Sequence, residues 1–340
     1  MLQAVMTEPG KIEFREVKKP EIRDNQVLIR VKRIGVCGSD IHVYHGTHPY
    51  TGYPVVQGHE VSGIIAEMGH GVQDLALGDK VTFTPQVTDG TCYQCRHGAY
   101  HICDSLKVMG FQTGGAAAEY FPIDADMVLK IPAAVSLDEA AMIEPTSVAV
   151  HALRRAGDIK GKKVLVLGSG TIGNLVGQVA RASGAGAVIN ADISDYKLDK
   201  AKACGLRHVV NTHRENPSET ITRVFGPDRA DLILECVGAQ ETIDQAIDNA
   251  RKGTTIVVVG VFGEKPRVDL GLVQDRELSL VGTLMYQKSD YERAIELVES
   301  GKMHLQEMIT HRFDFKDYLD AYQAIEESAG KYMKVMIELD

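Results

Sequence analysis

The sequence has no tryptophan and only 6% aromatic residues, which by itself excludes no class of protein. It has no uninterrupted apolar run of about 18 residues, the length that a membrane-spanning helix needs. Glu8 interrupts the N-terminal segment too early for the apolar core of a secretory signal. Positive charge is not in excess, since the formal net charge is -9 and the pI is near 5.8. We therefore expect no membrane span and neither nucleic acid nor an anionic membrane as the main partner, and we expect a cytoplasmic protein.

The length of 340 residues predicts two domains, and 44% hydrophobic residues can supply a core for each. No repeat, low-complexity stretch or long linker is visible. The first part, residues 1–150, reads as β-rich. Strands are expected at 27–32, where apolar and polar residues alternate, and at 61–68 and 80–83. Glycines between these segments suit the short strands and turns of a small barrel.

The second part, residues 151–284, alternates predicted strands and helices, which is typical of a doubly wound parallel sheet. Two helices are expected after it, and the alternating last strand is expected to return to the first domain. The later expected elements are strands at 231–236 and 254–260, helices at 291–300 and 318–327, and the last strand at 332–339.

The six cysteines are clustered in part, and clustered cysteines in a large chain of this kind suggest a metal before disulfides. Cys92, Cys95 and Cys103 lie close together in the sequence. Cys204 and Cys236 stand singly in apolar segments, so we expect them to be small buried side chains.

A glycine-rich turn follows a predicted buried strand, in the segment VLVLGSGTIG at 164–173. A helix is predicted directly after it, and then a strand at 187–191 that ends at Asp192. Asp192 lies 19 residues after Gly173, where a carboxylate would hold the adenosine ribose hydroxyls. Together these elements predict a dinucleotide site at a helix N-terminus. The expected residues of the turn are Gly168, Gly170, Thr171, Ile172 and Gly173.

Asp192 also favours NAD over NADP, because a carboxylate repels the 2′-phosphate of NADP and accepts a hydrogen bond from the ribose hydroxyl of NAD. Ile193 and Ser194 follow it, so no arginine stands there. Lys197 either assists at the ribose or is a solvated surface lysine. Further cofactor contacts are expected at Val237, Gly238, Val259, Gly260 and Thr283.

Three short segments of the first part carry ligand types that zinc prefers: GVCGSDIH at 35–42, GHE at 58–60 and IEP at 143–145. Each segment alone is a weak signal. Their joint presence upstream of a dinucleotide fold indicates a metal centre.

With these motifs, and GGAAAEY at 114–120, the chain resembles the zinc-dependent medium-chain dehydrogenases, in the branch of polyol (sorbitol), threonine and sugar-acid dehydrogenases. The resemblance covers essentially the whole chain. It implies a GroES-like, barrel-type catalytic domain at 1–150 that is completed by about 285–340. It also implies a Rossmann domain at 151–284 that binds NAD, and a catalytic zinc in the cleft between the two.

By position, the resemblance makes Cys37 and His59 zinc ligands, with Glu60 and Glu144 completing the sphere, alternating with a water. Asp40 either orients His59 or is a surface aspartate. Ser39 and His42 take the positions of the proton relay that follows Cys37, because a hydroxyl and a histidine that titrates near neutral pH suit this task.

The segment DGTCYQCRHGAYHIC at 89–103 matches the family's structural-zinc lobe, here at 86–105, except that aspartate replaces the first cysteine. We expect Asp89, Cys92, Cys95 and Cys103 to bind a structural zinc. The alternative is an empty lobe with free thiols. His97 and His101 are expected to be exposed loop residues, although either could substitute as a ligand.

The resemblance implies hydride transfer from a secondary alcohol of a polyol, sugar or sugar acid to NAD, giving a ketone. Tyr44, Phe111, Glu119 and Tyr286 are the candidate substrate residues, although Glu119 could be merely structural. In the polyol branch an arginine precedes the tyrosine of the 282–286 segment. Met285 stands there in this chain, which argues against sorbitol itself.

Other functions stay open. A dehydrogenase of the L-threonine 3-dehydrogenase type, or of another secondary alcohol or diol, shares these motifs. A zinc-free reductase and a non-enzymatic relative fit less well, because Cys37, His59 and Glu144 are all present. The polyol branch suggests a homotetramer, with a homodimer as the second choice, and strands near 256–260 and 267–284 could extend a sheet across a two-fold axis.

Overall fold

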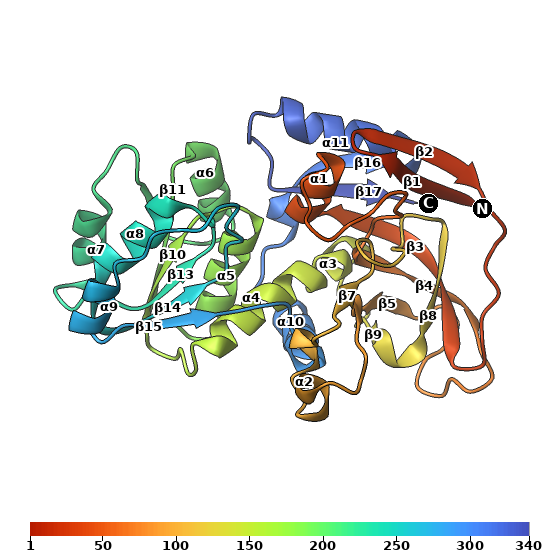
Figure 1. The fold of residues 1–340 in the computed structure, drawn as a ribbon, viewed down its shortest axis with the longest axis horizontal. Helices are drawn as coiled ribbons and strands as arrows, with labels where there is room; N and C mark the ends of the chain where they lie inside the picture. The colour runs from red at the N-terminus through yellow and green to blue at the C-terminus, as the bar shows by residue number, and fades with distance from the viewer. Residues whose placement is uncertain (340) are drawn as a thin grey trace. The chain divides into compact units, whose positions relative to one another are not determined.

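The computed structural model describes residues 1–339, which form two compact units (Figure 1). Unit 1 consists of Met1–Glu144, Gln287–Glu299 and the described chain from 309 onward. Unit 2 consists of Pro145–Tyr286 and Ser300–Met308. Within the described residues, no helix is long and apolar enough to cross a membrane.

Unit 1 is built on a seven-stranded sheet with the order β16-β17-β3-β4-β5-β9, in which β8 also pairs with β3. A two-stranded hairpin (β1 and β2) and a short strand pair (β6 and β7) accompany it. The strands are β1 Leu2–Glu8, β2 Lys11–Glu16, β3 Gln26–Val36, β4 Glu60–Met68, β5 Lys80–Phe83, β6 Gln86–Val87, β7 Lys107–Val108, β8 Tyr120–Asp124, β9 Val128–Lys130, β16 Ile309–Asp314 and β17 Lys334–Glu338.

The helices of unit 1 are short, apart from α10 and α11 near the C-terminus. They are α1 Gly38–Tyr44, α2 Tyr93–Arg96, η1 Tyr100–Ile102, η2 Ala125–Met127, α3 Leu137–Ala141, α10 Lys288–Glu299, η4 Phe315–Asp317 and α11 Tyr318–Glu327. Helix α4, Ile143–Arg155, begins in unit 1 and continues into unit 2.

Strand β3 contains the predicted strand at 27–32 and is longer than it. Val27, Leu28, Ile29 and Val31 are all buried, at 1% exposure or less, whereas Arg30 is exposed and Lys32 is half-buried. The polar side chains of the alternating sequence are thus the accessible ones, as the half-buried pattern predicts. The strand pairs with β4, β8 and β17, so it lies inside the sheet and not at its edge.

The last strand, β17, returns to unit 1 as expected and pairs antiparallel with β3. Its sequence alternates apolar and polar residues, but the structure buries residues of both kinds. Lys334 through Ile337 are all buried, so the strand has no solvent face and Lys334 points its charge into the protein.

Unit 2 contains a six-stranded parallel sheet with the order β12-β11-β10-β13-β14-β15. This is the 3-2-1-4-5-6 order of the Rossmann fold, so the predicted doubly wound sheet is confirmed. The elements are β10 Lys163–Leu167, α5 Thr171–Ala182, β11 Ala187–Asp192, α6 Asp195–Ala203, β12 His208–Asn211, α7 Pro217–Phe225, β13 Ala230–Glu235, α8 Gln240–Asn249, β14 Ala250–Val258, α9 Leu270–Asp275, β15 Ser279–Gly282 and η3 Gln306–Met308.

Asp138 ties α3 to the sheet of unit 1. It accepts hydrogen bonds from Arg33 of β3 at 2.7 Å and pairs with Arg312 of β16 at 2.8 Å. Burial raises the pKa of Asp138, but the two guanidinium groups outweigh burial and lower it. The folded pKa therefore lies below the ordinary value of about 4, and the stabilisation is present above that pH and is lost as the pH falls through the folded pKa.

Asp138→Asn should consequently lower the free energy of unfolding by about 1 kcal/mol at pH 7, since partly buried charged hydrogen bonds are lost. The melting temperatures of variant and wild type should converge as the pH falls below about 4. Glu67→Gln, which removes the exposed pair with Lys19, is the control and should change stability by less. A constant difference between Asp138→Asn and wild type across this pH range would contradict the assignment.

Candidate active site

Cys37, His59 and Glu60 form a cluster at the joined ends of β3 and β4. Gly35 lies opposite Glu60 in the antiparallel register of these strands. Cys37 follows the end of β3 and caps the N-terminus of α1, and His59 precedes the first residue of β4. One ligand atom from each of the three side chains lies within 4.8 Å of the others. The pairing of the two strands therefore brings together residues that are about 20 positions apart in the chain.

Asp40 orients this cluster and is not a surface residue, since it is 1% exposed. Its Oδ2 accepts a hydrogen bond from the backbone N–H of Cys37 at 2.9 Å, and its Oδ1 lies 3.6 Å from Nδ1 of His59. With Nδ1 facing a carboxylate, Nε2 is the imidazole nitrogen left for a metal. The structure thus favours the orienting role that the sequence left open for Asp40.

Acidic side chains and a thiol lie near two basic side chains at this site, His59 and Lys334. Burial lowers the pKa of His59, but Asp40, Cys37 and Glu144 outweigh burial and raise it well above its ordinary value. Glu144 is buried at the start of α4, and it also raises the pKa of Lys334. A thiol, an imidazole and carboxylates in an electronegative buried site are a donor set that fits zinc. Glu144 lies near the cluster but outside the three-residue group.

Glu60 has a partner that the sequence did not indicate. Both of its carboxylate oxygens accept hydrogen bonds from Nζ of Lys334, at 2.7 and 2.5 Å, and the pair is almost fully buried. The Glu60 carboxylate lies over Gly35, where a Cβ would stand 2.2 Å from its Oε2. Only glycine fits at position 35 with this arrangement, and a role of Glu60 as zinc ligand would require it to share or leave Lys334.

The two expected relay residues lie on α1, the helix that Cys37 caps. Ser39 is half-buried, and His42 is exposed with its Nδ1 3.4 Å from Oγ1 of Thr47. Ser39 therefore lies two positions after Cys37 on the same helix, and His42 faces solvent. Their role as a proton relay stays a prediction.

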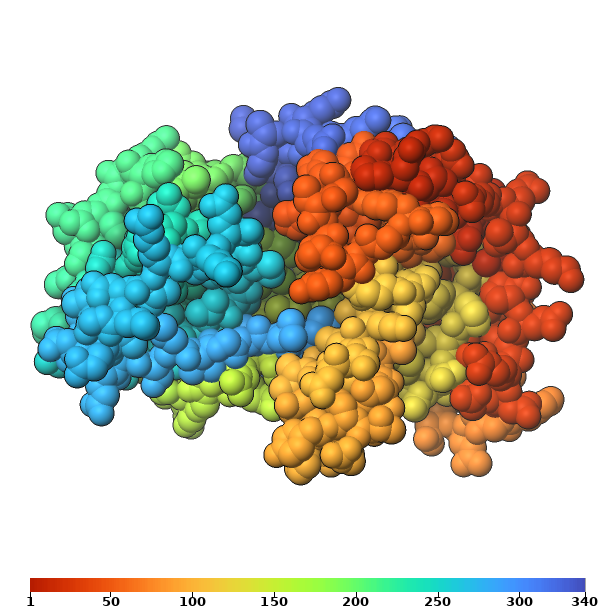
Figure 2. Space-filling model, in the orientation of Figure 1, coloured from red at the N-terminus to blue at the C-terminus, as the bar shows by residue number. Residues whose placement is uncertain are grey.

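Asp89, Cys92, Cys95 and Cys103 form a second group whose ligand atoms lie within 4.8 Å of one another. Backbone N–H groups donate to the sulfurs: Cys95 to Cys92, and Asp89 and Ser105 to Cys103, each at 3.4 Å. Such bonds stabilise the thiolate form that binds a metal. Figure 2 shows this segment at the surface, in the golden orange of residues near 100.

Asp89 is well prepared to act as the fourth ligand. The N–H groups of Cys92 and Thr91 donate to its Oδ1, at 2.8 and 2.7 Å, and hold its pKa well below the usual range. The carboxylate is therefore charged at any working pH. Of the two loop histidines, His97 is exposed and bonded to the carbonyl oxygen of Tyr93, but His101 is buried, which corrects the expectation that both are exposed.

Asp89→Ala should lower the zinc content of the purified protein from about two ions per chain to about one, because three thiols alone leave the tetrahedral lobe incomplete. Metal content is measured by mass spectrometry after dialysis. Asp104→Ala, an exposed neighbour in the same loop, should retain both ions. An unchanged zinc content in Asp89→Ala would show that Asp89 is not a ligand.

Unit 2 contains the glycine-rich turn at which the nucleotide site is expected. Gly168 has a φ of 92°, and a Cβ on Gly173 would lie 1.9 Å from the carbonyl oxygen of Gly168, so both positions require glycine. Helix α5 begins at Thr171 directly after this turn, with its free N–H groups available to a pyrophosphate. Asp192 ends β11, and its two oxygens accept hydrogen bonds from the N–H groups of Ser169 and Ser194, at 2.7 and 2.9 Å.

Glu235 is a further residue of this site that sequence reasoning missed. Its buried carboxylate accepts hydrogen bonds from the N–H groups of Val237 and Gly238 and from Oγ1 of Thr242, at 2.7 to 2.9 Å. Its own carbonyl oxygen accepts from Val259 and Gly260. Glu235 thus fixes both loops in which cofactor contacts are expected. A glutamate inside an apolar strand was the available signal.

Of the four candidate substrate residues, only Phe111 is seen to contact the metal cluster. The ring of Phe111 lies 4.9 Å from that of His59 and stacks on His48 at 4.8 Å, so it borders the metal cluster. Tyr44 packs on Tyr322 in the core. Glu119 accepts a hydrogen bond from the N–H of Leu2 at 2.7 Å, which favours its structural interpretation. Tyr286 is fully buried, so it offers no exposed surface to a substrate.

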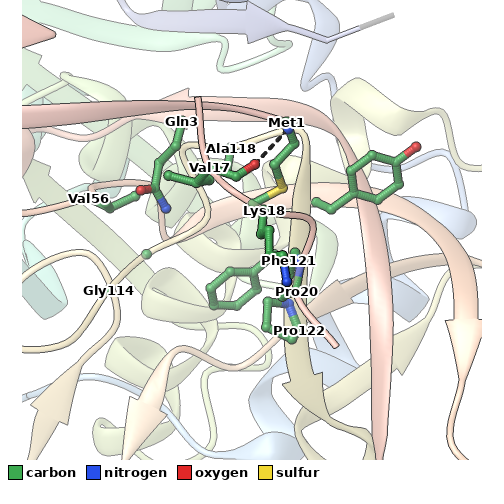
Figure 3. A pocket seen from close by; sticks show the side chains of 12 residues that line it. Met1, Gln3, Val17, Lys18, Pro20, Val56, Gly114, Ala118, Phe121 and Pro122 are labelled. Carbon is green, nitrogen blue, oxygen red and sulfur yellow. Dashed lines mark hydrogen bonds between the residues drawn. The ribbon is translucent and has the colours of Figure 1, made fainter. Parts of the chain in front are cut away.

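A surface pocket of about 320 Å³ lies elsewhere on unit 1, beside the N-terminus (Figure 3). Met1, Lys18, Val56, Gly114 and Phe121 are among its lining residues. None of the candidate metal ligands or substrate residues lines it. The pocket therefore has no part in the proposed chemistry.

The chain is similar to known dehydrogenases over nearly its whole length. Residues 23–133 match the alcohol dehydrogenase GroES-like domain, and residues 171–300 match the zinc-binding dehydrogenases. The D-xylulose reductase of Saccharomyces cerevisiae is 36% identical, over 98% of this chain and 96% of that protein. The sorbitol dehydrogenase of Halalkalibacterium halodurans is 35% identical, over 99% of each. A solved structure described as a short chain alcohol dehydrogenase from Escherichia coli, complexed with NADH, has a TM-score of 0.92 and 30% identity, over 100% of this chain and 99% of that one.

Proposed function

Because this chain belongs to the zinc-binding alcohol dehydrogenase family, we propose that it oxidises a secondary alcohol of a polyol, sugar or sugar acid to a ketone and reduces NAD. The observation that carries the proposal is the cluster of half-buried Cys37 with buried His59 and Glu60, in a chain whose full-length relatives include a sorbitol dehydrogenase and a D-xylulose reductase. The N-terminal part, to about 150 and completed from about 285, supplies the catalytic domain, and 151–284 binds NAD.

Cys37 and His59 would hold the catalytic zinc, with Glu60 or Glu144 completing its sphere. When bound, zinc polarises the alcohol oxygen and NAD supplies the carbon that accepts the hydride. Asp40 keeps the His59 ring in place, and Phe111 covers one side of the cluster and excludes water from it. Ser39 would accept the hydroxyl proton of the substrate while it gives its own hydroxyl proton toward His42, and His42 would release a proton to solvent.

The cofactor residues act by position and charge. The Gly168–Gly173 turn admits the pyrophosphate to the N-terminus of α5, and Asp192 accepts hydrogen bonds from the adenosine ribose. Lys197, Val237, Gly238, Val259, Gly260 and Thr283 complete the expected contacts. Since Met285 replaces an arginine that the polyol branch carries, the substrate need not be sorbitol.

We further propose a homotetramer, with a homodimer as the alternative, in the cytoplasm. Strand β15 is an edge of the parallel sheet, and its Leu280 is partly exposed, so it can pair with the same strand of a second copy.

The substrate class is tested by following NADH formation with a panel of polyols, inositols, sugar acids, threonine and simple secondary alcohols. We expect turnover of one or more polyhydroxylated compounds and little or none of threonine. A preference for threonine would instead support the dehydrogenase of the L-threonine 3-dehydrogenase type. Absence of turnover with every compound, from protein that retains zinc, would contradict the proposed substrate class.

A further inference from the structure

A buried chain of polar side chains leads from helix α11 to the metal cluster. It runs from Tyr322 through Gln57 and Asp40 to His59. We propose that Gln57 and Tyr322 are positioning residues that fix the Asp40 carboxylate, and through it the imidazole of His59, for zinc binding. The inference rests on the zinc site of the proposed function and adds two residues that no motif contains.

The contacts of this chain are specific. Oη of Tyr322 donates to Oε1 of Gln57 at 2.8 Å. Nε2 of Gln57 donates to Oδ1 of Asp40 at 3.1 Å and to the Asp40 carbonyl oxygen at 3.3 Å. The four side chains are buried, with exposures of 0% for Tyr322, 2% for Gln57, 1% for Asp40 and 4% for His59. Water therefore cannot replace a lost partner without rearrangement of the core.

The orientation of the Gln57 amide follows from these partners. An amide has one donor end and one acceptor end, and the Tyr322 hydroxyl occupies the acceptor. The NH₂ group is consequently turned toward Asp40, where it faces the same oxygen, Oδ1, that lies 3.6 Å from His59. The other oxygen of Asp40 is held by the N–H of Cys37. Both oxygens are thus engaged, and the carboxylate cannot rotate without breaking its hydrogen bonds to Cys37 and Gln57.

The backbone at Gln57 is also fixed. Its carbonyl oxygen accepts from the N–H of Ala117 at 2.8 Å. A Cβ on Gly115 would lie 2.5 Å from that oxygen, so the close approach depends on glycine. The amide is therefore held at both its backbone and its side chain, as a positioning group requires.

The test uses the purified zinc-loaded protein and the variants Tyr322→Phe, which removes one oxygen, Gln57→Leu, and Gln57→Glu, which keeps the shape but replaces the donor by an acceptor. Zinc release to the chromogenic chelator 4-(2-pyridylazo)resorcinol is followed in time. A parallel run with Cys37→Ser identifies the phase that belongs to the catalytic site. Tyr291→Phe is the matched control, because it removes a buried hydroxyl bonded to Phe83 elsewhere in unit 1.

We expect release from the catalytic site to be about tenfold faster in both Gln57 variants and severalfold faster in Tyr322→Phe, the lower end of the range for groups that orient a metal ligand. The rate of zinc release from the structural-zinc lobe at 86–105 should not change, and neither should the affinity for NADH. The inference would be overturned if Tyr322→Phe and every folded Gln57 variant released zinc from the catalytic site at the wild-type rate. It would also be overturned if the control Tyr291→Phe accelerated this release equally. If wild-type protein shows no zinc phase that depends on Cys37, the zinc site of the proposed function fails instead.

Discussion

Cys37→Ser should reduce turnover by about 10³-fold or more while NADH still binds. A serine hydroxyl stays protonated near neutral pH and is a poor zinc ligand, whereas the thiolate is a strong one. A bound metal stabilises the charge of the transition state by about 4 kcal/mol, so its loss lowers the rate by about a thousandfold. The expected cofactor residues belong to unit 2, so the dissociation constant of NADH, measured by fluorescence titration, should stay at the wild-type value.

Cys204→Ser is the matched control for Cys37→Ser. Cys204 is likewise a free thiol, but it is buried in unit 2, where it contacts the carbonyl oxygen of His304 at 3.6 Å. It should retain both turnover and zinc content. Turnover of Cys37→Ser near the wild-type rate would remove Cys37 from the metal site.

Asp192→Ala should lower the preference for NAD over NADP by about 10 to 100-fold. The variant loses a charged hydrogen-bond acceptor for the ribose, which contributes about 1.5–3 kcal/mol, and it no longer repels a 2′-phosphate. The quantity to measure is the ratio of kcat/KM for NAD to kcat/KM for NADP.

Asp192→Asn separates charge from loop geometry, because Asp192 also holds the N–H groups of Ser169 and Ser194. The amide keeps one oxygen acceptor but loses the repulsive charge, so we expect an intermediate ratio. Asp195→Asn, an exposed carboxylate in the first turn of α6, should leave the ratio unchanged. An unchanged ratio in Asp192→Ala would mean that this carboxylate does not discriminate the two cofactors.

The nucleotide-binding fold could be predicted because its signal is local. Strand, glycines, helix and Asp192 follow one another within about 30 residues, and the parallel sheet that they imply is present. The candidate metal cluster could also be predicted, since Cys37, His59 and Glu60 lie in short recognisable segments. The predicted strand at 27–32 had the right position, and its exposed Arg30 and half-buried Lys32 agree with the half-buried pattern.

The partners of the site could not be predicted, because they come from distant parts of the chain. Lys334 is 274 residues from Glu60, and Tyr322 is 265 residues from Gln57. The antiparallel pairing of β17 with β3 brings Lys334 to the cluster, and no sequence pattern encodes that register. The sequence around Lys334 also gives no sign of its burial, which the structure shows at 2% exposure.

The central claim is that zinc held by Cys37 and His59 is required for NAD-linked oxidation of a polyhydroxylated alcohol. The most direct test measures NADH formation from the best compound of the panel before zinc removal by a chelator, after it, and after zinc is added back. We predict loss of turnover on removal and recovery on addition, with no recovery in Cys37→Ser. Full turnover by protein shown to contain no zinc would contradict the claim.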